Sequence, residues 1–424
     1  MKKNIHHNIN CRLCKSNNLE MVIPLEKIPL TEKYIDKNQL NTTSPYELYP
    51  IDIYMCLDCG HVQLLDVIDP DILWDDFTFR TGQAKVIIDH MKEVAKETCS
   101  KYKIKSNSLI IDVGSNDGTL LQGFKDHGMK VLGIDPAKDI ALEAINAGIP
   151  TLPEFLTESL AIKIIKDHGK ADVVACFNSF AHADNMNELM ACISDMVASD
   201  GIFVFEVSYL VDIIDNLLLG TFIHEHLCHY SVIALVKFFN QHGMELIEVE
   251  RVPYQGGSLI GVVQHIGGPH SVNQTVTELY EYEKARGFNL PETIKNFSKR
   301  LDKLIIEFNQ LILNWEKAGY EIAGYGSSRS SPTLLSQFKI GNKISFIVDD
   351  HPQKVNKYTP GDKIKVIPTK ELIKKMPKYT IILAWIHAES IISNNHEYLR
   401  KGGNFVVLLP EIRLITAEDI PYFS

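Results

Sequence analysis

An alternation of short apolar runs with helix-length segments is the feature that most constrains how this chain folds. Between about 81 and 267 the runs are rich in Ile and Val, and a predicted helix at 85–102 precedes the first of them. This pattern is typical of a mostly parallel sheet that helices cover on both faces. The predicted strands are Leu109–Val113, Lys130–Ile134, Asp172–Phe177, Ile202–Val207 and Ser258–Gln264.

A second, smaller unit of the same kind is predicted for 268–424. Its first part, 268–294, is polar and reads as irregular, whereas Lys295–Lys317 has apolar residues at helical spacing. The sequence therefore predicts an α/β protein with two Rossmann-like domains, at 81–267 and 268–424. The predicted strands of the second are Glu321–Tyr325, Ile344–Val348, Thr380–Trp385 and Asn404–Leu409.

Composition excludes several classes of protein. The 424 residues carry a net charge of -10, which disfavours a protein that binds duplex nucleic acid. No apolar run approaches the roughly 18–20 residues of a membrane span, and the polar N-terminus lacks the apolar core of a signal peptide. We therefore expect a cytoplasmic protein without membrane partners, whose eight cysteines are thiols or metal ligands rather than disulfides.

Two Cys-x-x-Cys pairs lie in the first 80 residues, Cys11/Cys14 and Cys56/Cys59. Four thiolates from two such knuckles suit tetrahedral Zn²⁺, and because they fill every coordination position the zinc would be structural. The alternatives are a redox pair or unrelated thiols, although neither pair lies convincingly at a strand–helix junction. The sequence thus predicts a zinc-binding region at 1–80. We expect most of the other cysteines to be buried and unreactive: Cys99, Cys176, Cys192 and Cys228.

A glycine-rich turn follows the first predicted strand of the 81–267 domain. Here Gly114 and Gly118 enclose Asp117, and the next strand ends at Asp135, where an acid accepts hydrogen bonds from ribose hydroxyls. An NAD site needs G-x-G-x-x-G, and Asp117 would repel a pyrophosphate. The turn instead favours the cationic S-adenosylmethionine. The predicted cofactor-binding residues are Asp112, Gly114, Ser115, Asn116, Asp117, Gly118, Asp135, Pro136 and Asn178.

A histidine-rich segment at 222–231 offers a third site. It contains His224-Glu225-His226, and Cys228 occupies the place that H-E-x-x-H would give to a second histidine. Metal binding therefore lacks a full ligand set. General base chemistry is favoured, since a histidine beside a carboxylate can be poised near neutral pH. Ordinary polar residues at a helix start are the remaining interpretation.

Taken together in their order, these motifs resemble the S-adenosylmethionine-dependent sugar C-methyltransferases of deoxysugar biosynthesis, of the tetronitrose C-3 methyltransferase type. The resemblance covers nearly the whole chain. Its further elements are Asn178-Ser179-Phe180-Ala181-His182, Tyr230-Ser231, Gly256-Gly257-Ser258-Leu259, Gly324-Tyr325-Gly326, Val348-Asp349-Asp350, Pro360-Gly361 and Leu383-Ala384-Trp385.

The resemblance implies a zinc region, a methyl-donor domain and a C-terminal domain that holds the nucleotide part of a nucleotide-linked 4-keto sugar. His226 would remove the C-3 proton, Glu225 would orient it and His182 would stabilise the enolate, with His224 beside them. A monomeric enzyme without nucleic-acid partners is expected. The implied substrate-binding residues are Gly257, Ser258, Tyr325, Ser327, Ser328, Arg329, Asp350 and Trp385.

This chain departs from the family around the sugar and its phosphates, while the methyl-donor motifs are intact. Hydroxyl groups that the family often carries are missing at Phe77, Phe79 and Ile223. Ile260 replaces a basic residue, Ile386 replaces an asparagine, and Arg329 stands one place from a usual lysine. An O-methyltransferase for sugars, or a cofactor-binding protein with impaired catalysis, are the alternative functions.

Overall fold

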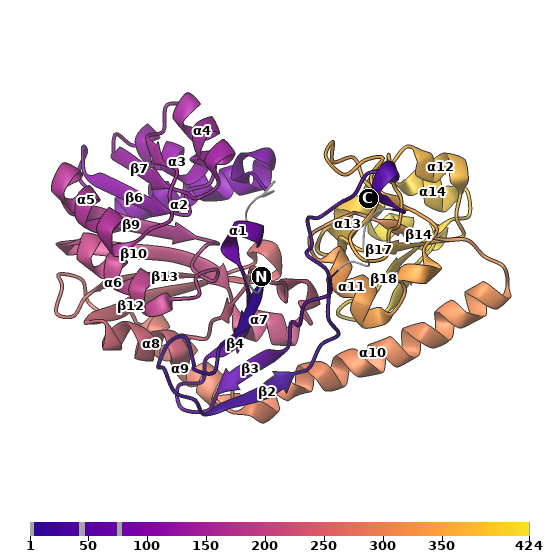
Figure 1. The fold of residues 1–424 in the computed structure, drawn as a ribbon, viewed down its shortest axis with the longest axis horizontal. Helices are drawn as coiled ribbons and strands as arrows, with labels where there is room; N and C mark the ends of the chain where they lie inside the picture. The colour runs from indigo at the N-terminus through magenta and orange to yellow at the C-terminus, as the bar shows by residue number, and fades with distance from the viewer. Residues whose placement is uncertain (1–3, 42–46, 74–78, 424) are drawn as a thin grey trace. The chain divides into compact units, whose positions relative to one another are not determined.

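The computed structural model describes residues 4–41, 47–73 and 79–423, and the chain in it forms two compact units (Figure 1). The first unit contains the chain up to Glu20, Tyr54–Val211 and Glu225–Pro291. The second contains Met21–Ile53, Asp212–His224 and Glu292–Ser424. Each unit thus draws on three separated stretches, whereas the sequence analysis divides the chain only at 80 and 267. That division into functional domains stays a prediction.

A seven-stranded sheet is the centre of the first unit, with strand order β12-β13-β10-β9-β6-β7-β8. Strand β13 runs antiparallel to β12 and β10 on its two sides, and the other neighbouring strands of the sheet pair in parallel. Apolar runs of Ile and Val form the inner strands because both faces of a largely parallel sheet are buried. The strands are β6 (Leu109–Val113), β7 (Lys130–Ile134), β8 (Thr151–Leu152), β9 (Ala171–Phe177), β10 (Val197–Ser208), β12 (Met244–Val252) and β13 (Ser258–His265). The predicted α/β class is confirmed.

Helices cover this sheet on both faces, as Figure 1 shows. The apolar residues of α2, α3 and α4 pack in one core against β6, β9, β10 and β13. On the other face α8 and α9 contact each other and β12. The helices are α1 (Pro70–Leu73), α2 (Lys85–Lys101), α3 (Thr119–Asp126), α4 (Lys138–Asn146), α5 (Glu158–His168), α6 (Met186–Met196), α8 (Val232–Gln241) and α9 (Gln274–Ala285).

The expectation of an irregular segment at 268–294 is wrong. Helix α9 occupies its middle, and α10 already begins at Pro291. Asn273 caps α9, since its side chain accepts a hydrogen bond from the Thr275 amide at 3.0 Å. The apolar stripe of α9 is weak because its buried face carries the carboxyl group of Glu283. Helical periodicity of apolar residues therefore could not reveal it.

A small four-stranded sheet, in the order β11-β4-β3-β2, carries the cysteine pairs. Its strands are β2 (Leu19–Ile23), β3 (Ile53–Cys56), β4 (Val62–Leu64) and β11 (Cys228–His229). Strand β11 lies within the histidine-rich segment at 222–231 and pairs with β4, so this segment is tied to the N-terminal sheet. A further pair joins β1 (Ile5–His7) to β5 (Asp66–Ile68).

The second unit holds a six-stranded sheet in the order β16-β15-β14-β17-β18-β19, parallel except at β19. Its strands are β14 (Ile322–Tyr325), β15 (Ile347–Val348), β16 (Val366–Ile367), β17 (Tyr379–Ile382), β18 (Asn404–Val407) and β19 (Arg413–Ile415). Its helices are α7 (Leu210–Asp215), α10 (Pro291–Lys317), α11 (Ser331–Phe338), α12 (Glu371–Lys375), α13 (Ala388–Ser393) and α14 (His396–Arg400). The first two residues of α7 belong to the first unit.

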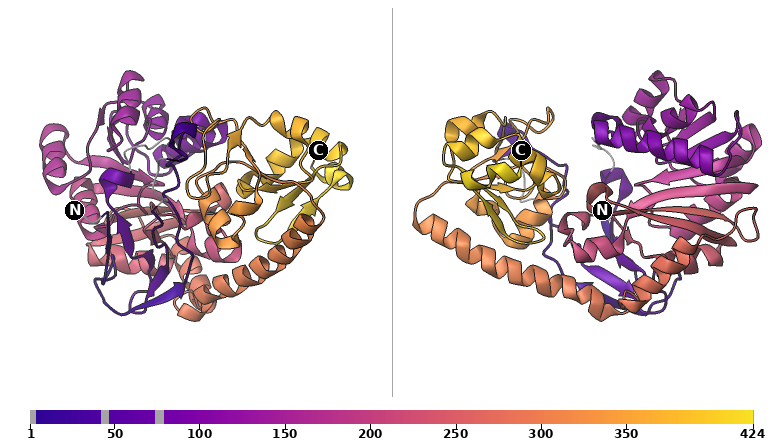
Figure 2. Two further views of the ribbon diagram at one scale, coloured as in Figure 1. Left: turned by 45° about the vertical axis from the view of Figure 1, so that its right-hand side comes forward. Right: turned by 180° about the vertical axis from the view of Figure 1, so that it is seen from behind.

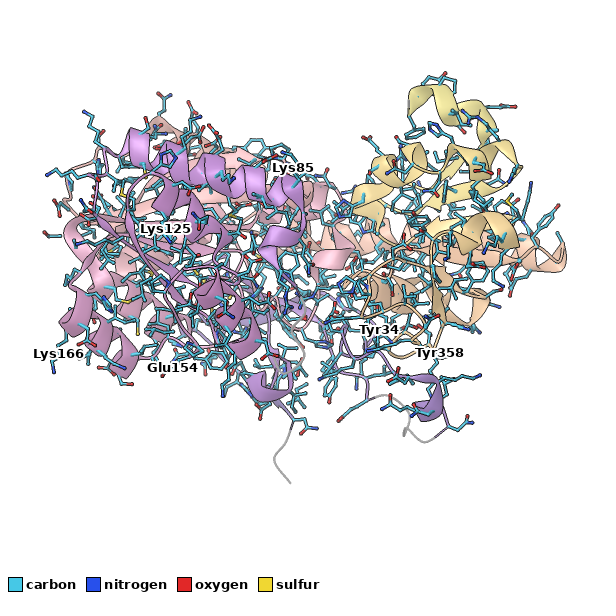
Figure 3. All side chains as sticks on the ribbon, turned by 90° about the horizontal axis from the view of Figure 1, so that it is seen from above. Tyr34, Lys85, Lys125, Glu154, Lys166 and Tyr358 are labelled. Carbon is cyan, nitrogen blue, oxygen red and sulfur yellow. The ribbon has the colours of Figure 1, made fainter. Side chains whose placement is uncertain are left out.

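Helix α10 is a single unbroken helix in both views of Figure 2. The N-terminal stretch at 21–53 joins the same unit through an isolated bridge between Ile35 and Tyr358, and Figure 3 labels Tyr34 and Tyr358 in this part. In the described ranges no helix combines the length and the apolar composition of a membrane span.

Candidate active site

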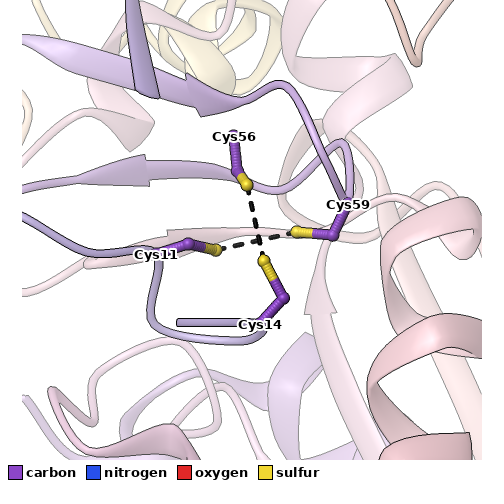
Figure 4. A group of neighbouring side chains, drawn as sticks. All are labelled: Cys11, Cys14, Cys56 and Cys59. Carbon is purple, nitrogen blue, oxygen red and sulfur yellow. Dashed lines mark hydrogen bonds between the residues drawn. The ribbon is translucent and has the colours of Figure 1, made fainter. Parts of the chain in front are cut away.

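The four predicted zinc ligands form one cluster (Figure 4). The sulfur atoms of Cys11 and Cys59 lie 3.6 Å apart, those of Cys14 and Cys56 lie 3.5 Å apart, and all four lie within 4.8 Å of one another. A tetrahedron of thiolates with Zn–S bonds of about 2.3 Å places its sulfurs about 3.8 Å apart. The arrangement therefore fits a Zn²⁺ ion with no position left for a reacting water.

Both knuckles close in the same way. The amide of Lys15 donates to the Cys11 carbonyl at 3.0 Å, and the amide of Gly60 donates to the Cys56 carbonyl at 2.8 Å. Lys15 and Gly60 have φ values of 63° and 83°, in the left-handed region. Glycine takes this conformation without strain, which explains its place after the second pair.

Arg12 ties the first knuckle to the loop after β9. Its buried guanidinium donates through Nε to Asp184 at 3.0 Å and through Nη1 to the carbonyl of Leu64. The side-chain amide of Asn187 donates to the Arg12 carbonyl at 2.6 Å. The zinc knuckle is thus bonded to the segment that carries His182.

The loop predicted to bind the methyl donor, Gly114–Gly118 after β6, is called the donor loop below, and it takes the shape that its glycines permit. Gly114 has a φ of 79°, and a Cβ atom there would lie 2.4 Å from Cβ of Ser179. Ser179 itself donates to the Val113 carbonyl at 2.7 Å. Gly118 also has a φ of 79° and starts α3. Only glycine at 114 lets the loops after β6 and β9 approach this closely.

Two buried acids lie under the donor loop, Asp112 and Asp135. Burial, and then the charge of Asp135, raise the pKa of Asp112 to about 7. Its Oδ1 atom has no hydrogen-bond partner among the described residues. Burial also raises the pKa of Asp135, although the amides of Asn116 and Ala137 donate to its carboxylate at 2.8 and 2.9 Å. A cationic ligand with ribose hydroxyls would satisfy both groups.

Two polar side chains of the loop form hydrogen bonds with the backbone of another segment. Asn116 accepts from the Thr81 amide at 2.9 Å and donates to the Phe79 carbonyl, and Asp117 accepts from the Gly82 amide at 2.7 Å. These two side chains therefore hold the segment before α2 over the loop. Sequence spacing could not reveal this role, because the segment lies 35 residues away.

Three further residues are predicted to bind the methyl donor, of which one lies within the loop and two lie beside it. Ser115 is buried, and its amide donates to the Ile134 carbonyl at 3.2 Å. Pro136 directly follows Asp135. Asn178 has a φ of 54°, and its amide donates to the Glu206 carbonyl at 2.9 Å. All three lie at the carboxyl end of the sheet, where ligands of such folds bind.

His182 and His226 come together at the same end of the sheet. Their rings stack with centroids 5.3 Å apart and planes inclined by 9°. The Ala181 carbonyl fixes the pair, since it accepts from the amides of Leu227 at 2.9 Å and Cys228 at 3.1 Å. Both residues are partly exposed, although the Nε2 atom of His182 is itself buried.

His224 makes its own contacts. It belongs to the second unit, where it is 1% exposed and packs edge-to-face on Tyr49 with centroids 5.8 Å apart. Its Nε2 atom lies 3.4 Å from the Tyr49 carbonyl. Glu225 is buried and belongs to the first unit. The structure therefore groups His182 with His226 and gives His224 a packing contact.

Of the residues that replace family hydroxyls, Phe77 lies outside the described residues. Phe79 is exposed and Ile223 is buried.

The predicted residues Gly257 and Ser258 lie where a tight turn enters β13. Gly257 has a φ of 138°, and its carbonyl accepts from the Tyr209 amide at 3.2 Å. The Ser258 hydroxyl donates to the Tyr254 carbonyl. Two residues near this turn escaped the sequence analysis, His90 and Glu206, because nothing in their spacing relates α2 to β10.

The second unit has its own glycine turn between β14 and α11. A Cβ atom at Gly326 would lie 2.4 Å from Cβ of Ala384, and the amide of Ser327 donates to Asp349 at 2.6 Å. The hydroxyl groups of Ser328 and Ser331 lie 3.0 Å apart. The turn is closed by hydrogen bonds among its own small polar residues.

Two cations and one acid gather at this turn. Lys354 Nζ donates to the Ser327 carbonyl at 2.9 Å and lies 3.4 Å from Glu32, while Arg329 Nε lies 3.7 Å from Glu32. The Tyr34 and Ser327 hydroxyls are 2.6 Å apart. The sequence analysis found Arg329 but missed Lys354, Glu32 and Tyr34, which come from distant parts of the chain.

Three further predicted substrate residues lie at the same sheet. Tyr325 accepts a hydrogen bond from Asn395 at 3.2 Å, and Asp350 accepts one from the Thr369 amide at 3.0 Å. Trp385 is 9% exposed, and its indole N–H has no partner in the described part of the chain.

Comparisons with known proteins match this chain over most of its length. Three family models align with residues 11–74 ("Putative zinc binding domain"), 87–249 (methyltransferase domain) and 253–410 (C-methyltransferase C-terminal domain). The C-methyltransferase NovU of Streptomyces niveus is 30% identical over 410 residues, which cover 96% of this chain and 97% of that protein. This chain belongs to the C-methyltransferase family. It is therefore an S-adenosylmethionine-dependent methyltransferase, as the sequence predicts, with zinc as its second cofactor.

Similar solved structures cover less of the chain. The magnesium protoporphyrin IX methyltransferase of Synechocystis PCC 6803 is 16% identical, with a TM-score of 0.35 over 46% of this chain and 99% of that chain. A methyltransferase of Clostridium acetobutylicum is 12% identical, with a TM-score of 0.35 over 46% of this chain and 95% of that chain.

Proposed function

We propose that this C-methyltransferase transfers a methyl group to C-3 of a nucleotide-linked 4-keto deoxysugar through an enolate. Carbon is a poor nucleophile until a proton leaves it, so an enzyme of this family needs a base beside its donor site. Bound S-adenosylmethionine supplies an electrophilic methyl group. The 4-ketone acidifies the neighbouring C-3 proton and can carry the resulting charge.

The observation that carries this proposal is the stacked pair His182 and His226. Ser179 packs against Gly114 of the donor loop, and the His182 amide donates to the Ser179 carbonyl at 3.0 Å. His182 is therefore separated by a single turn from Ser179, the residue that contacts the donor loop. As the C–H bond at C-3 breaks, His226 takes the proton, and the electron pair moves toward the ketone oxygen.

His182 has a different role in this proposal. An N–H group of His182 stabilises the developing charge on the enolate oxygen. Glu225 orients His226, and we assign His224 to packing rather than to the reaction.

In the second unit we assign the nucleotide to the turn between β14 and α11. Backbone amides at the start of a helix, together with Arg329 and Lys354, suit a diphosphate. Glu32 neutralises these cations in the absence of the nucleotide. Asp350, Tyr325 and Trp385 lie at the ends of neighbouring strands, where they can contact the nucleoside.

Hydrogen exchange at C-3 tests the proposal. In deuterium oxide and without methyl donor, the wild type is expected to exchange the C-3 hydrogen of a 4-keto dTDP-, GDP- or CDP-sugar. A positioned base typically contributes about 10²–10⁴-fold, so His226→Ala should lose exchange and methylation by that factor while donor binding stays normal. His182→Ala should lose less.

His168→Ala is the matched control, because His168 is exposed at the end of α5. Wild-type exchange and methylation by His226→Ala would place the base elsewhere. A product with its methyl group on oxygen, identified by mass spectrometry and NMR, would replace the enolate mechanism with O-methylation.

A further inference from the structure

A buried acid–histidine contact lies beneath the turn that enters β13. Glu206 on β10 is fully buried, and its Oε2 atom lies 2.6 Å from Nε2 of His90 on α2. The other oxygen, Oε1, has no hydrogen-bond partner among the described residues. A buried carboxylate is costly unless a cation or donors accompany it, so His90 is the group that compensates Glu206.

His90 also contacts the turn itself. Its ring stacks on Tyr254 with centroids 4.4 Å apart and planes inclined by 13°. The next three residues, Gln255, Gly256 and Gly257, have φ values of 49°, 90° and 138°. Glycine takes such φ values without strain, so Gln255 is the strained residue of the turn, and it keeps this conformation only when its neighbours hold it.

The surroundings of His90 favour its charged form. Glu206 faces it from β10, Glu250 from β12 and Glu97 from its own helix, and the hydroxyl of Tyr254 is neutral. Burial by itself lowers the pKa of His90. The three carboxylates outweigh this effect, so the pKa of His90 is raised. Stabilisation by this pair is therefore complete below the ordinary histidine pKa of about 6.5 and is lost as the pH rises through the raised value.

We propose that His90, as an imidazolium held by Glu206, is a positioning residue that fixes the turn from Tyr254 to Ser258 and so shapes the acceptor side of the site. Its kinetic consequence rests on the proposed function, because Gly257 and Ser258 are assigned to the acceptor there. The structural consequence, order in the turn, does not depend on the acceptor.

The cross-strand neighbour of Glu206 provides a rescue experiment. Ile260 on β13 pairs with Glu206 on one side and with Glu250 on the other. Ile260 is only partly buried. A guanidinium introduced there would lie between two carboxylates, and the free Oε1 of Glu206 could accept from it.

Amide hydrogen exchange on the full-length, zinc-loaded protein tests the structural claim. A charge-assisted hydrogen bond is worth roughly 1.5–3 kcal/mol, so His90→Ala should raise exchange at 254–258 about tenfold or more. His90→Phe keeps a ring against Tyr254 but no charge, and it should also lose protection. The double variant His90→Ala/Ile260→Arg should recover most of it, and His168→Ala should behave as the wild type.

The pH dependence and the kinetics separate this role from general damage to the fold. Protection of the turn and the His90 ring signal in NMR should titrate together, and Glu206→Gln should lower the midpoint of both. With an active 4-keto sugar, His90→Phe should raise the acceptor KM about tenfold and leave donor affinity unchanged. Unchanged exchange in both His90→Ala and His90→Phe would overturn the proposal. If no sugar is methylated, the proposed function fails, while the exchange result still decides the role of His90.

Discussion

Asp135 is the residue whose loss should weaken donor binding most directly. Its carboxylate is 6% exposed and accepts two backbone amides, one on each oxygen. A carboxylate oxygen has room for a second donor, so each can also take a ribose hydroxyl. Asp135→Ala removes this charge-assisted pair, and at roughly 1.5–3 kcal/mol for each bond we expect donor affinity to fall at least about tenfold.

The same substitution should also lower stability. The amides of Asn116 and Ala137 lose their acceptor, and an unsatisfied buried donor costs about 1–3 kcal/mol. Calorimetric titration with S-adenosylmethionine measures the first effect, and urea unfolding without ligand measures the second. Asp139→Ala is the control, because Asp139 is exposed in the first turn of α4. Unchanged donor affinity in folded Asp135→Ala would refute the ribose assignment.

Three further predictions concern the metal, the nucleotide and pH. Metal analysis should find one zinc per chain with four sulfur ligands, and Cys56→Ser should lose it together with stability; two disulfides would contradict this. Arg329→Ala should weaken acceptor binding about tenfold by calorimetry, and equal affinity would make Arg329 a surface charge. Burial raises the pKa of Glu283 from 4.5 to about 7, against hydrogen bonds from the amides of Val232 and Ile233 and the hydroxyl of Tyr209. Because the folded state holds this proton more tightly, Glu283 should lower the free energy of unfolding by about 3 kcal/mol between pH 4.5 and 7, and Glu283→Gln should remove this contribution while that of Asp112 remains.

Local sequence determined the elements whose signal is periodic. Strands β6 and β7 begin and end where the apolar runs do, and α2 ends one residue before its predicted end. The two cysteine pairs and the glycine turn after β6 were also readable, because each depends on residues that are close in sequence. Spacing alone predicts a knuckle or a glycine turn, since a few backbone bonds define each of them.

Tertiary structure alone decided which distant side chains meet. The sequence places His224 and His226 two residues apart, yet the fold buries one on Tyr49 and stacks the other on His182. His90 and Glu206 are separated by 116 residues, and only the packing of α2 on β10 brings them to 2.6 Å. Helix and strand periods specify which face a side chain occupies, but they contain no information about the partner that packs on that face. The partner is set by how the sheet orders its strands, which is a property of the whole core.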